Sequence, residues 1–179
     1  MEWNSMSNLR LIKETTASSV TSASITDVFS SDFDIYKIVF RDLHNANQKN
    51  FNMRYIDSGG SVISAGNYDI AKEYQYSHAT YYEVRATNQT EWELGHYDVD
   101  AAASGIGSTI YIFNPYSSSH YTFMMSESIY YEQIGGGANA SKEIGVLKQK
   151  ASMTGLNFFL DSAATITSFK VACYGLRRD

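Results

Sequence analysis

Residues 34–43 read DIYKIVFRDL, and this stretch decides the fold class. Tyr36, Ile38 and Phe40 fall on one side of an extended chain, whereas Lys37 and Val39 fall on the other. An alternation with a period of two is typical of a strand with one buried face. Residues 51–57, FNMRYID, repeat this pattern after a polar loop. The DSGGS that follows is typical of a turn in which glycine supplies positive φ.

The second half of the chain continues in the same way. Its runs are β-branched or aromatic and are bounded by Gly, Ser, Asn or Asp: STIYIFN, HYTFMMSESIYYE, EIGVLKQ, LNFFLDS and TITSFKVACYGL. Strands that alternate with long helices, as in α/β folds, are not indicated. About nine short strands with regular turn signals predict an all-β fold, a β-sandwich of jelly-roll type.

The domain boundaries and the middle of the chain follow from the same pattern. We expect residues 1–7 to be a flexible N-terminal arm and residues 8–179 to form a single β-sandwich domain, because no linker or repeat divides them. The apolar spacing of residues 67–78 fits neither the period of a helix nor that of a strand well, so we expect a short helix or a long ordered loop there. Residues 88–108 are a polar, glycine-bearing excursion. The prediction is therefore a sandwich with long loops in its middle.

The composition limits the kinds of partner. The chain has 14 Tyr, 9 Phe and 2 Trp in 179 residues, whereas only 18% of its residues are charged, below the usual quarter. Such a composition suits surfaces that lie against other protein or glycan. The net charge of −5 argues against a nucleic-acid partner. The apolar runs are too short for a membrane span of roughly 18 residues, and the N-terminus lacks the layout of a signal peptide. We therefore expect that the chain does not insert into a membrane and that it is synthesised in a cytosol.

No cofactor or metal site and no catalytic residues are expected. The four histidines are scattered without metal-binding spacing. The single cysteine, Cys173, excludes an intramolecular disulfide and is expected to be a buried small residue. Glu91 and Glu93 flank Trp92, and in a strand their carboxylates would share a face roughly 7 Å apart, near the separation in inverting glycosidases. Any E-x-E pattern does the same, so we regard a glycan-cleaving enzyme as a weak hypothesis.

Residues 114–120, NPYSSSH, contain the only proline of the chain. Proline lacks an N–H and favours strand ends and turns, so the segment is interpreted as a hairpin connection between 108–113 and 120–125. Rigid amphipathic aromatic residues at such a tip can also contact a sugar or a neighbouring subunit. The candidate glycan or subunit contacts are Trp92, Tyr97, Tyr116, His120 and Tyr121.

Two stretches resemble a known class of proteins. They are residues 8–40, NLRLIKETTASSVTSASITDVFSSDFDIYKIVF, and residues 145–179, GVLKQKASMTGLNFFLDSAATITSFKVACYGLRRD. Together with NMRYIDSGGS and IYIFNPYSSS, they resemble small virion structural proteins of tailed bacteriophages, especially phages of marine bacteria and cyanobacteria. Members are described as tail fibre-like or head-decoration proteins. These motifs are not catalytic signatures, and no functional residue is carried over with them.

The resemblance implies a non-enzymatic virion structural protein that assembles in copies on the particle surface. It would be a capsid decoration or tail accessory subunit, made in the host cytoplasm and released by lysis. Its partners would be itself, as a homo-oligomer for which a trimer is plausible, and other capsid or tail proteins. The alternative is a receptor-binding adhesin module of a tail or head fibre that recognises host-surface carbohydrate.

Overall fold

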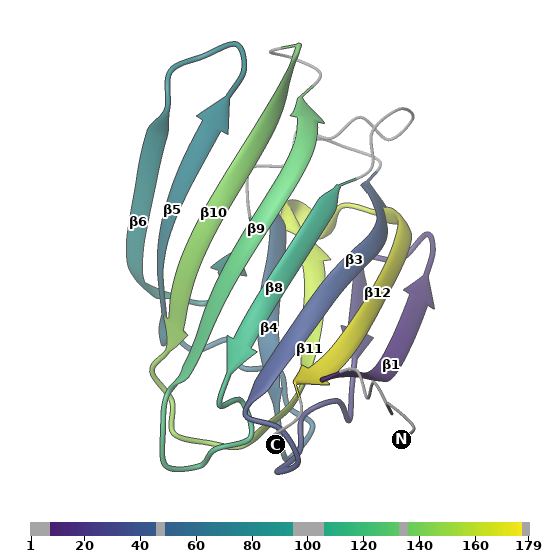
Figure 1. The fold of residues 1–179 in the computed structure, drawn as a ribbon, viewed down its shortest axis with the longest axis vertical. Helices are drawn as coiled ribbons and strands as arrows, with labels where there is room; N and C mark the ends of the chain where they lie inside the picture. The colour runs from purple at the N-terminus through teal and green to yellow at the C-terminus, as the bar shows by residue number, and fades with distance from the viewer. Residues whose placement is uncertain (1–7, 46–48, 95–105, 133–135, 177–179) are drawn as a thin grey trace, which may run out of the picture.

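The computed structural model describes residues 8–45, 49–94, 106–132 and 136–176. Two antiparallel sheets pack face to face, so the chain is an all-β sandwich; Figure 1 shows the larger sheet in front of the smaller one. The strands of the described residues are β1 (Leu9–Ala17), β2 (Ser22–Ile25), β3 (Ile35–Asn45), β4 (Phe51–Asp57), β5 (Tyr68–Tyr76), β6 (Tyr82–Gln89), β7 (Trp92–Glu93), β8 (Gly107–Phe113), β9 (Thr122–Glu132), β10 (Gly137–Leu147), β11 (Met153–Leu160) and β12 (Ile166–Leu176); a 3-10 turn, η1 (Asp161–Ala163), precedes β12.

The strand order shows how the chain is wound. The large sheet has the order β1-β12-β3-β8-β9-β10-β5-β6, and the small sheet has the order β2-β11-β4-β7. Four pairs are nested: β1 with β12, β2 with β11, β3 with β8, and β4 with β7. Strands β9, β10, β5 and β6 extend the large sheet beyond β8. The first and last described strands are therefore neighbours, and both ends of the fold are held in one sheet.

The core lies between the sheets and is rich in aromatic residues. Phe40 of the large sheet meets Phe51 and Phe158 of the small sheet edge to face, with ring centroids 5.5 and 5.2 Å apart. The inward positions of β3 predicted from the sequence, Tyr36, Ile38 and Phe40, are all buried. Burial of apolar side chains from both sheets is the main force that holds such a sandwich together.

The expectation for residues 67–78 is wrong. Residues 68–76 form neither a helix nor a loop but strand β5, and residues 82–89 form β6 beside it. The apolar pattern of β5 was obscured by Lys72, which occupies an inward position between Ile70 and Tyr74 and is buried. Of the long loops expected in the middle of the chain, residues 67–78 are thus largely strand, whereas residues 95–105 of the expected excursion lie outside the described residues. The described residues contain twelve strands where about nine were expected.

Two further expectations concern single segments. Cys173 is buried on β12, which confirms the prediction. The N-terminal arm at residues 1–7 lies outside the described residues.

Candidate functional site

The connection between β8 and β9 is a hairpin loop, as predicted. It begins with a turn in which the Ser117 N–H donates to the Asn114 carbonyl at 3.2 Å. Two backbone hydrogen bonds attach it to the body of the fold: Asn114 N–H donates to the Asp34 carbonyl at 2.7 Å, and Met153 N–H donates to the Pro115 carbonyl at 2.8 Å. Asn114 adopts a positive φ of 56°, which asparagine tolerates better than most residues. The loop is therefore held at both sheets.

A small polar network forms the tip of this loop. The Nδ1 atom of His120 lies 3.0 Å from the Ser117 hydroxyl and 3.1 Å from the Ser119 hydroxyl. Ser117 Oγ also accepts from the backbone N–H groups of Ser119 and His120, at 3.3 and 3.2 Å. A serine hydroxyl that bonds the next backbone turn in this way stabilises the turn. The serines and the histidine thus build the loop and present their remaining polar atoms to solvent.

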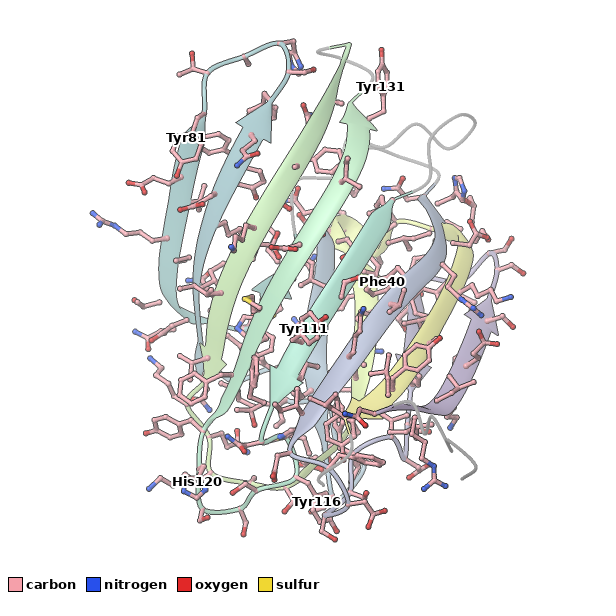
Figure 2. The ribbon with its side chains drawn as sticks, viewed as in Figure 1. Phe40, Tyr81, Tyr111, Tyr116, His120 and Tyr131 are labelled. Carbon is pink, nitrogen blue, oxygen red and sulfur yellow. The ribbon has the colours of Figure 1, made fainter. Side chains whose placement is uncertain are left out.

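A cavity of about 380 Å³ opens between this loop and the β2–β3 connection. Tyr116 and His120, both predicted contacts, line it, and Figure 2 shows both at the loop end of the molecule. The opposite wall is fixed because the Tyr36 hydroxyl accepts from Ser30 N–H and donates to the Ser30 carbonyl, each at 2.8 Å. The lining as a whole combines hydroxyl, carboxylate, amide, imidazole and aromatic groups: Ser30, Ser31, Phe33, Asp34, Asn114, Tyr116, Ser117, Ser119 and His120.

The structure separates the remaining predicted contacts from this cavity. Tyr121 is 40% exposed but does not line the cavity; Lys150 Nζ lies 6.0 Å from the centre of its ring. Trp92 is fully buried, with its ring 5.0 Å from that of Tyr55 and 5.4 Å from that of Tyr68. A buried indole cannot stack on a sugar, so the expectation for Trp92 is wrong. Tyr97 lies outside the described residues.

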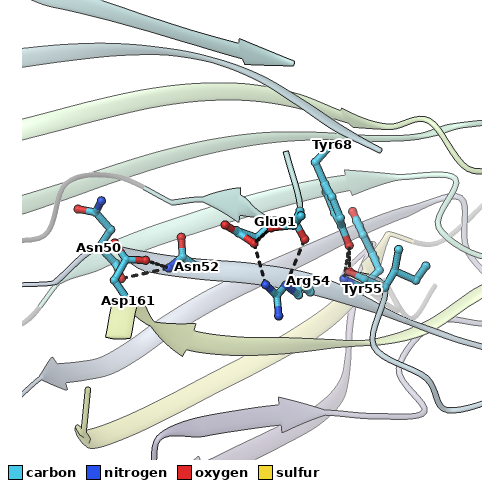
Figure 3. A network of polar contacts seen from close by, with 9 residues as sticks. Asn50, Asn52, Arg54, Tyr55, Tyr68, Glu91 and Asp161 are labelled. Atoms are coloured by element: carbon cyan, nitrogen blue, oxygen red, sulfur yellow. Dashed lines mark hydrogen bonds and ion pairs between the residues drawn. The ribbon is translucent and has the colours of Figure 1, made fainter. Parts of the chain in front are cut away.

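The two carboxylates beside Trp92 each have a basic partner. Glu91 accepts from Arg54 Nη2 at 2.8 Å (Figure 3), and Glu93 Oε1 lies 2.7 Å from Lys72 Nζ. Arg54 Nε also donates to the Thr90 carbonyl at 3.1 Å. These ion pairs join β7 and its approach to β4 in the small sheet and to β5 in the large sheet. Their geometry accounts for both carboxylates as structural links.

A buried charged cluster lies where β5, β9 and β10 meet. Glu143 is 1% exposed and accepts from the hydroxyls of Ser126 at 2.5 Å and Ser141 at 3.2 Å. Desolvation raises the pKa of Glu143 to about 7, although the nearby Lys72 ammonium and the two hydroxyls act in the opposite direction. Lys72 therefore interacts with two carboxyl groups: it forms an ion pair with Glu93, and its positive charge lowers the pKa of Glu143 electrostatically.

The outer face of the large sheet carries a row of apolar side chains. Residues directly opposite each other on paired strands point to the same face, and the register connects six strands from β1 to β10. The row is Leu9, Leu176, Ile35, Phe113, Phe123 and Val146, and it ends at Asp69 on β5. The outward face of an antiparallel sheet is usually polar, so an apolar row across six strands is unusual.

A second row lies beside the first, one outward position along each strand. It runs through Leu11, Tyr174, Lys37, Tyr111, Met125, Ile144 and Ala71 and ends at Arg85 on β6. Figure 2 shows Tyr111 on the face toward the viewer, near the middle of the sheet. We call the apolar members of these two rows the apolar face. Phe123 is 49% exposed and Ile144 is 56% exposed, so this surface is open to solvent in the single chain.

The apolar face is hollowed on one side. A depression of about 800 Å³ has Ala71 and Ile144 in its lining, with Phe123 on one side and Arg85 on the other. Because the depression follows the sheet, it is broad and suits another protein surface more than a small ligand. The sequence analysis missed this face. Its signal was the unbroken apolar run at 110–113 and 123–125, where both faces of a strand are apolar.

The described residues hold neither a metal-binding cluster nor a membrane-spanning helix. They contain no group of three or more His, Cys, Asp or Glu placed to hold a metal ion. In the same part of the chain, no helix is long and apolar enough to cross a membrane.

Comparison of the sequence with models of known protein families gave no match, and comparison with curated proteins gave no match either.

Proposed function

We propose that the chain is a non-enzymatic structural subunit on the surface of a tailed-bacteriophage particle, held there by protein–protein contact through its apolar face. The observation that carries the proposal is this face, which leaves Phe123, Ile144 and Leu11 about half exposed. Monomeric proteins rarely expose contiguous apolar patches of more than a few hundred Å² unless they bind something there. The resemblance of residues 8–40 and 145–179 to phage virion proteins supports the phage setting.

The winding of the chain supports the same proposal. We interpret the nested pairs β1–β12, β2–β11, β3–β8 and β4–β7 as a jelly roll whose large sheet is widened by β9, β10, β5 and β6. Jelly rolls of eight strands recur in viral capsid and lectin domains. One fold can have many functions, so the proposal rests mainly on the exposed apolar face.

The test is a cryo-electron microscopy map of purified particles of the phage that encodes the chain, with mass spectrometry of their proteins. We expect the chain to be a particle component. Density repeated over the capsid lattice identifies a decoration subunit, and density restricted to the tail identifies a tail accessory subunit. Absence of the chain from purified infectious particles contradicts the proposal.

The cavity beside the β8–β9 loop favours a second candidate function, a carbohydrate-binding adhesin module. An exposed tyrosine next to fixed hydroxyl, amide and carboxylate groups matches the two faces of a sugar, one apolar and one hydroxylated. A glycan array tests this candidate. Tyr116→Ala should abolish binding. Tyr82→Ala should retain it, because Tyr82 is equally exposed, at 41%, but lies on β6 and does not line the cavity. An array on which the wild-type chain retains no glycan eliminates this candidate.

A further inference from the structure

We infer that the apolar face binds the same face of a second copy of this chain, and that the two copies are related by a two-fold axis between β8 and β9. This inference rests on the proposed function only in taking the apolar face as an assembly surface. It adds the identity of the partner and the symmetry of the contact.

The size of the face is the first argument. Four of its side chains are between 39% and 56% exposed: Leu11, Phe123, Ile144 and Leu176. A large side chain of this kind offers about 100 Å² when half exposed, so these four offer about 400 Å². A standard interface buries about 800 Å² on each partner. The half-buried large apolar members of the two rows add to this area and bring the face towards that size: Leu9, Ile35, Tyr111, Phe113, Met125, Val146 and Tyr174.

The shape of the face is the second argument. It crosses nearly the whole width of an eight-stranded sheet, so its partner must be equally broad. Two sheets with the same twist pack face to face in nearly aligned orientation, with their side chains interleaved. A second copy of this chain supplies such a sheet with apolar rows in the same places. A contact of identical faces closes on itself as a two-fold dimer.

The distribution of side chains about the centre of the sheet is the third argument. In the order β1-β12-β3-β8-β9-β10-β5-β6 the centre falls between β8 and β9. We place the two-fold axis there, parallel to the strands and in the plane between the two sheets. It brings β8 against the partner's β9 and β12 against the partner's β5. Phe113 then meets Phe123 of the partner subunit. Tyr174 meets the depression at the partner's Ala71, where the partner's Arg85 lies beside it. A half-buried tyrosine and a depression thus occupy symmetric positions in the same row.

The charges fit this arrangement. Lys37 is the one charged residue in the two rows between β3 and β10, and its Nζ lies 5.6 Å from the centre of the Tyr111 ring. Other charges border the rows: Asp69 and Arg85 close them, Glu127 and Lys142 pair with each other one outward position beyond Met125 and Ile144, and Arg41 pairs with Glu14 beyond Lys37. An apolar centre with a polar rim is the usual composition of a stable protein interface.

Sedimentation equilibrium of the purified chain tests the inference. We expect a dimer. Phe123→Lys and Ile144→Lys place a charge in the centre of the contact and should weaken dimerisation by about 100-fold. Both residues are exposed, so the variants should keep the far-UV circular dichroism of the wild type. The control is Val62→Lys, since Val62 is 40% exposed but lies in the β4–β5 connection; this variant should remain a dimer.

Disulfide trapping tests the position of the axis. A mixture of the single variants Phe113→Cys and Phe123→Cys should give a cross-linked heterodimer, and each variant alone should give much less. The buried native thiol of Cys173 should not interfere. A monomer, a trimer, or dimers that persist in both lysine variants each overturn the inference. A monomeric chain whose apolar face is protected only in particles shows that another virion protein covers it. A dimeric chain that is absent from particles leaves this inference intact and contradicts the proposed function alone.

Discussion

Glu143 lies in an environment very different from that of an ordinary surface carboxyl. It is buried between two hydroxyls and near Lys72, and burial raises its pKa to about 7 from 4.5. The folded state therefore holds the proton more tightly than the unfolded chain. The stability that the neutral carboxyl contributes is complete below pH 4.5 and is lost as the pH rises through about 7.

Replacing Glu143 by Gln should remove this pH dependence. At pH 8 the variant should have a free energy of unfolding about 2 kcal/mol higher than the wild type, because the buried charge is gone while the two serine hydroxyls keep a partner. Near pH 4.5 the two proteins should be nearly equal. Urea unfolding at both pH values measures this. Glu83→Gln is the control, since Glu83 is exposed. A variant less stable than the wild type at pH 8 would show that the charge on Glu143 stabilises the fold.

Cys173 provides a second prediction at the scale of a single side chain. Its thiol is fully buried on β12, and desolvation raises its pKa to about 12. Only the thiolate reacts rapidly with a disulfide reagent. At pH 8 the native protein should therefore react with such a reagent about 100-fold more slowly than the chain unfolded in guanidinium. Rapid labelling without unfolding would contradict the burial of β12.

At the scale of the elements, the sequence predicted most strands but not the widening of the large sheet. Strands such as β3 were predictable because the large apolar residues Tyr36, Ile38 and Phe40 recur at every second position, with Lys37 and Arg41 on the opposite side. Strand β5 was not, because its inward Lys72 is neutralised by Glu93, 21 residues away in sequence. A charge at an inward position looks like a break in the pattern until its partner is known. Tertiary pairing of this kind is not encoded in local periodicity.

The candidate sites divide in the same way. The β8–β9 loop was predictable because Pro115 and the serines have local turn preferences. The apolar face was not, because it depends on the register of six strands that are far apart in sequence. Trp92 was misassigned for a related reason: nothing local to E-W-E shows that both carboxylates bind basic residues of other strands while the indole between them lies in the core.

The contact between β10 and β7 gives a prediction for an element pair. A Cβ atom on Gly145 would lie 2.7 Å from Trp92 Nε1 and 3.2 Å from the Asp69 carbonyl oxygen. Gly145→Ala should therefore lower the free energy of unfolding by about 1–3 kcal/mol, the usual cost of overpacking a core. The double variant Gly145→Ala with Trp92→Phe should lose less than the two single effects combined, because the smaller ring makes room. Strictly additive losses, measured by urea unfolding, would contradict this contact.

At the scale of the whole molecule, the described residues share one core. The phenylalanine cluster around Phe40 and the aromatic group around Trp92 belong to the same set of buried side chains, and both groups join the two sheets. The pairing of β1 with β12 connects the two ends of the described chain. Paired chain ends and a continuous core favour unfolding of the described residues as one unit.

Unfolding should consequently be a single cooperative transition. Far-UV circular dichroism follows all strands, whereas tryptophan fluorescence in a Trp3→Phe variant follows Trp92 alone, and the two probes should give the same midpoint in urea. The comparison is sharp because Trp92 lies beside the extension of the large sheet, packed against Tyr68 of β5. If β9, β10, β5 and β6 formed an independent unit, the fluorescence midpoint would differ from that of the dichroism. Coincident midpoints would show that the widened sheet and the nested strands fold as one body.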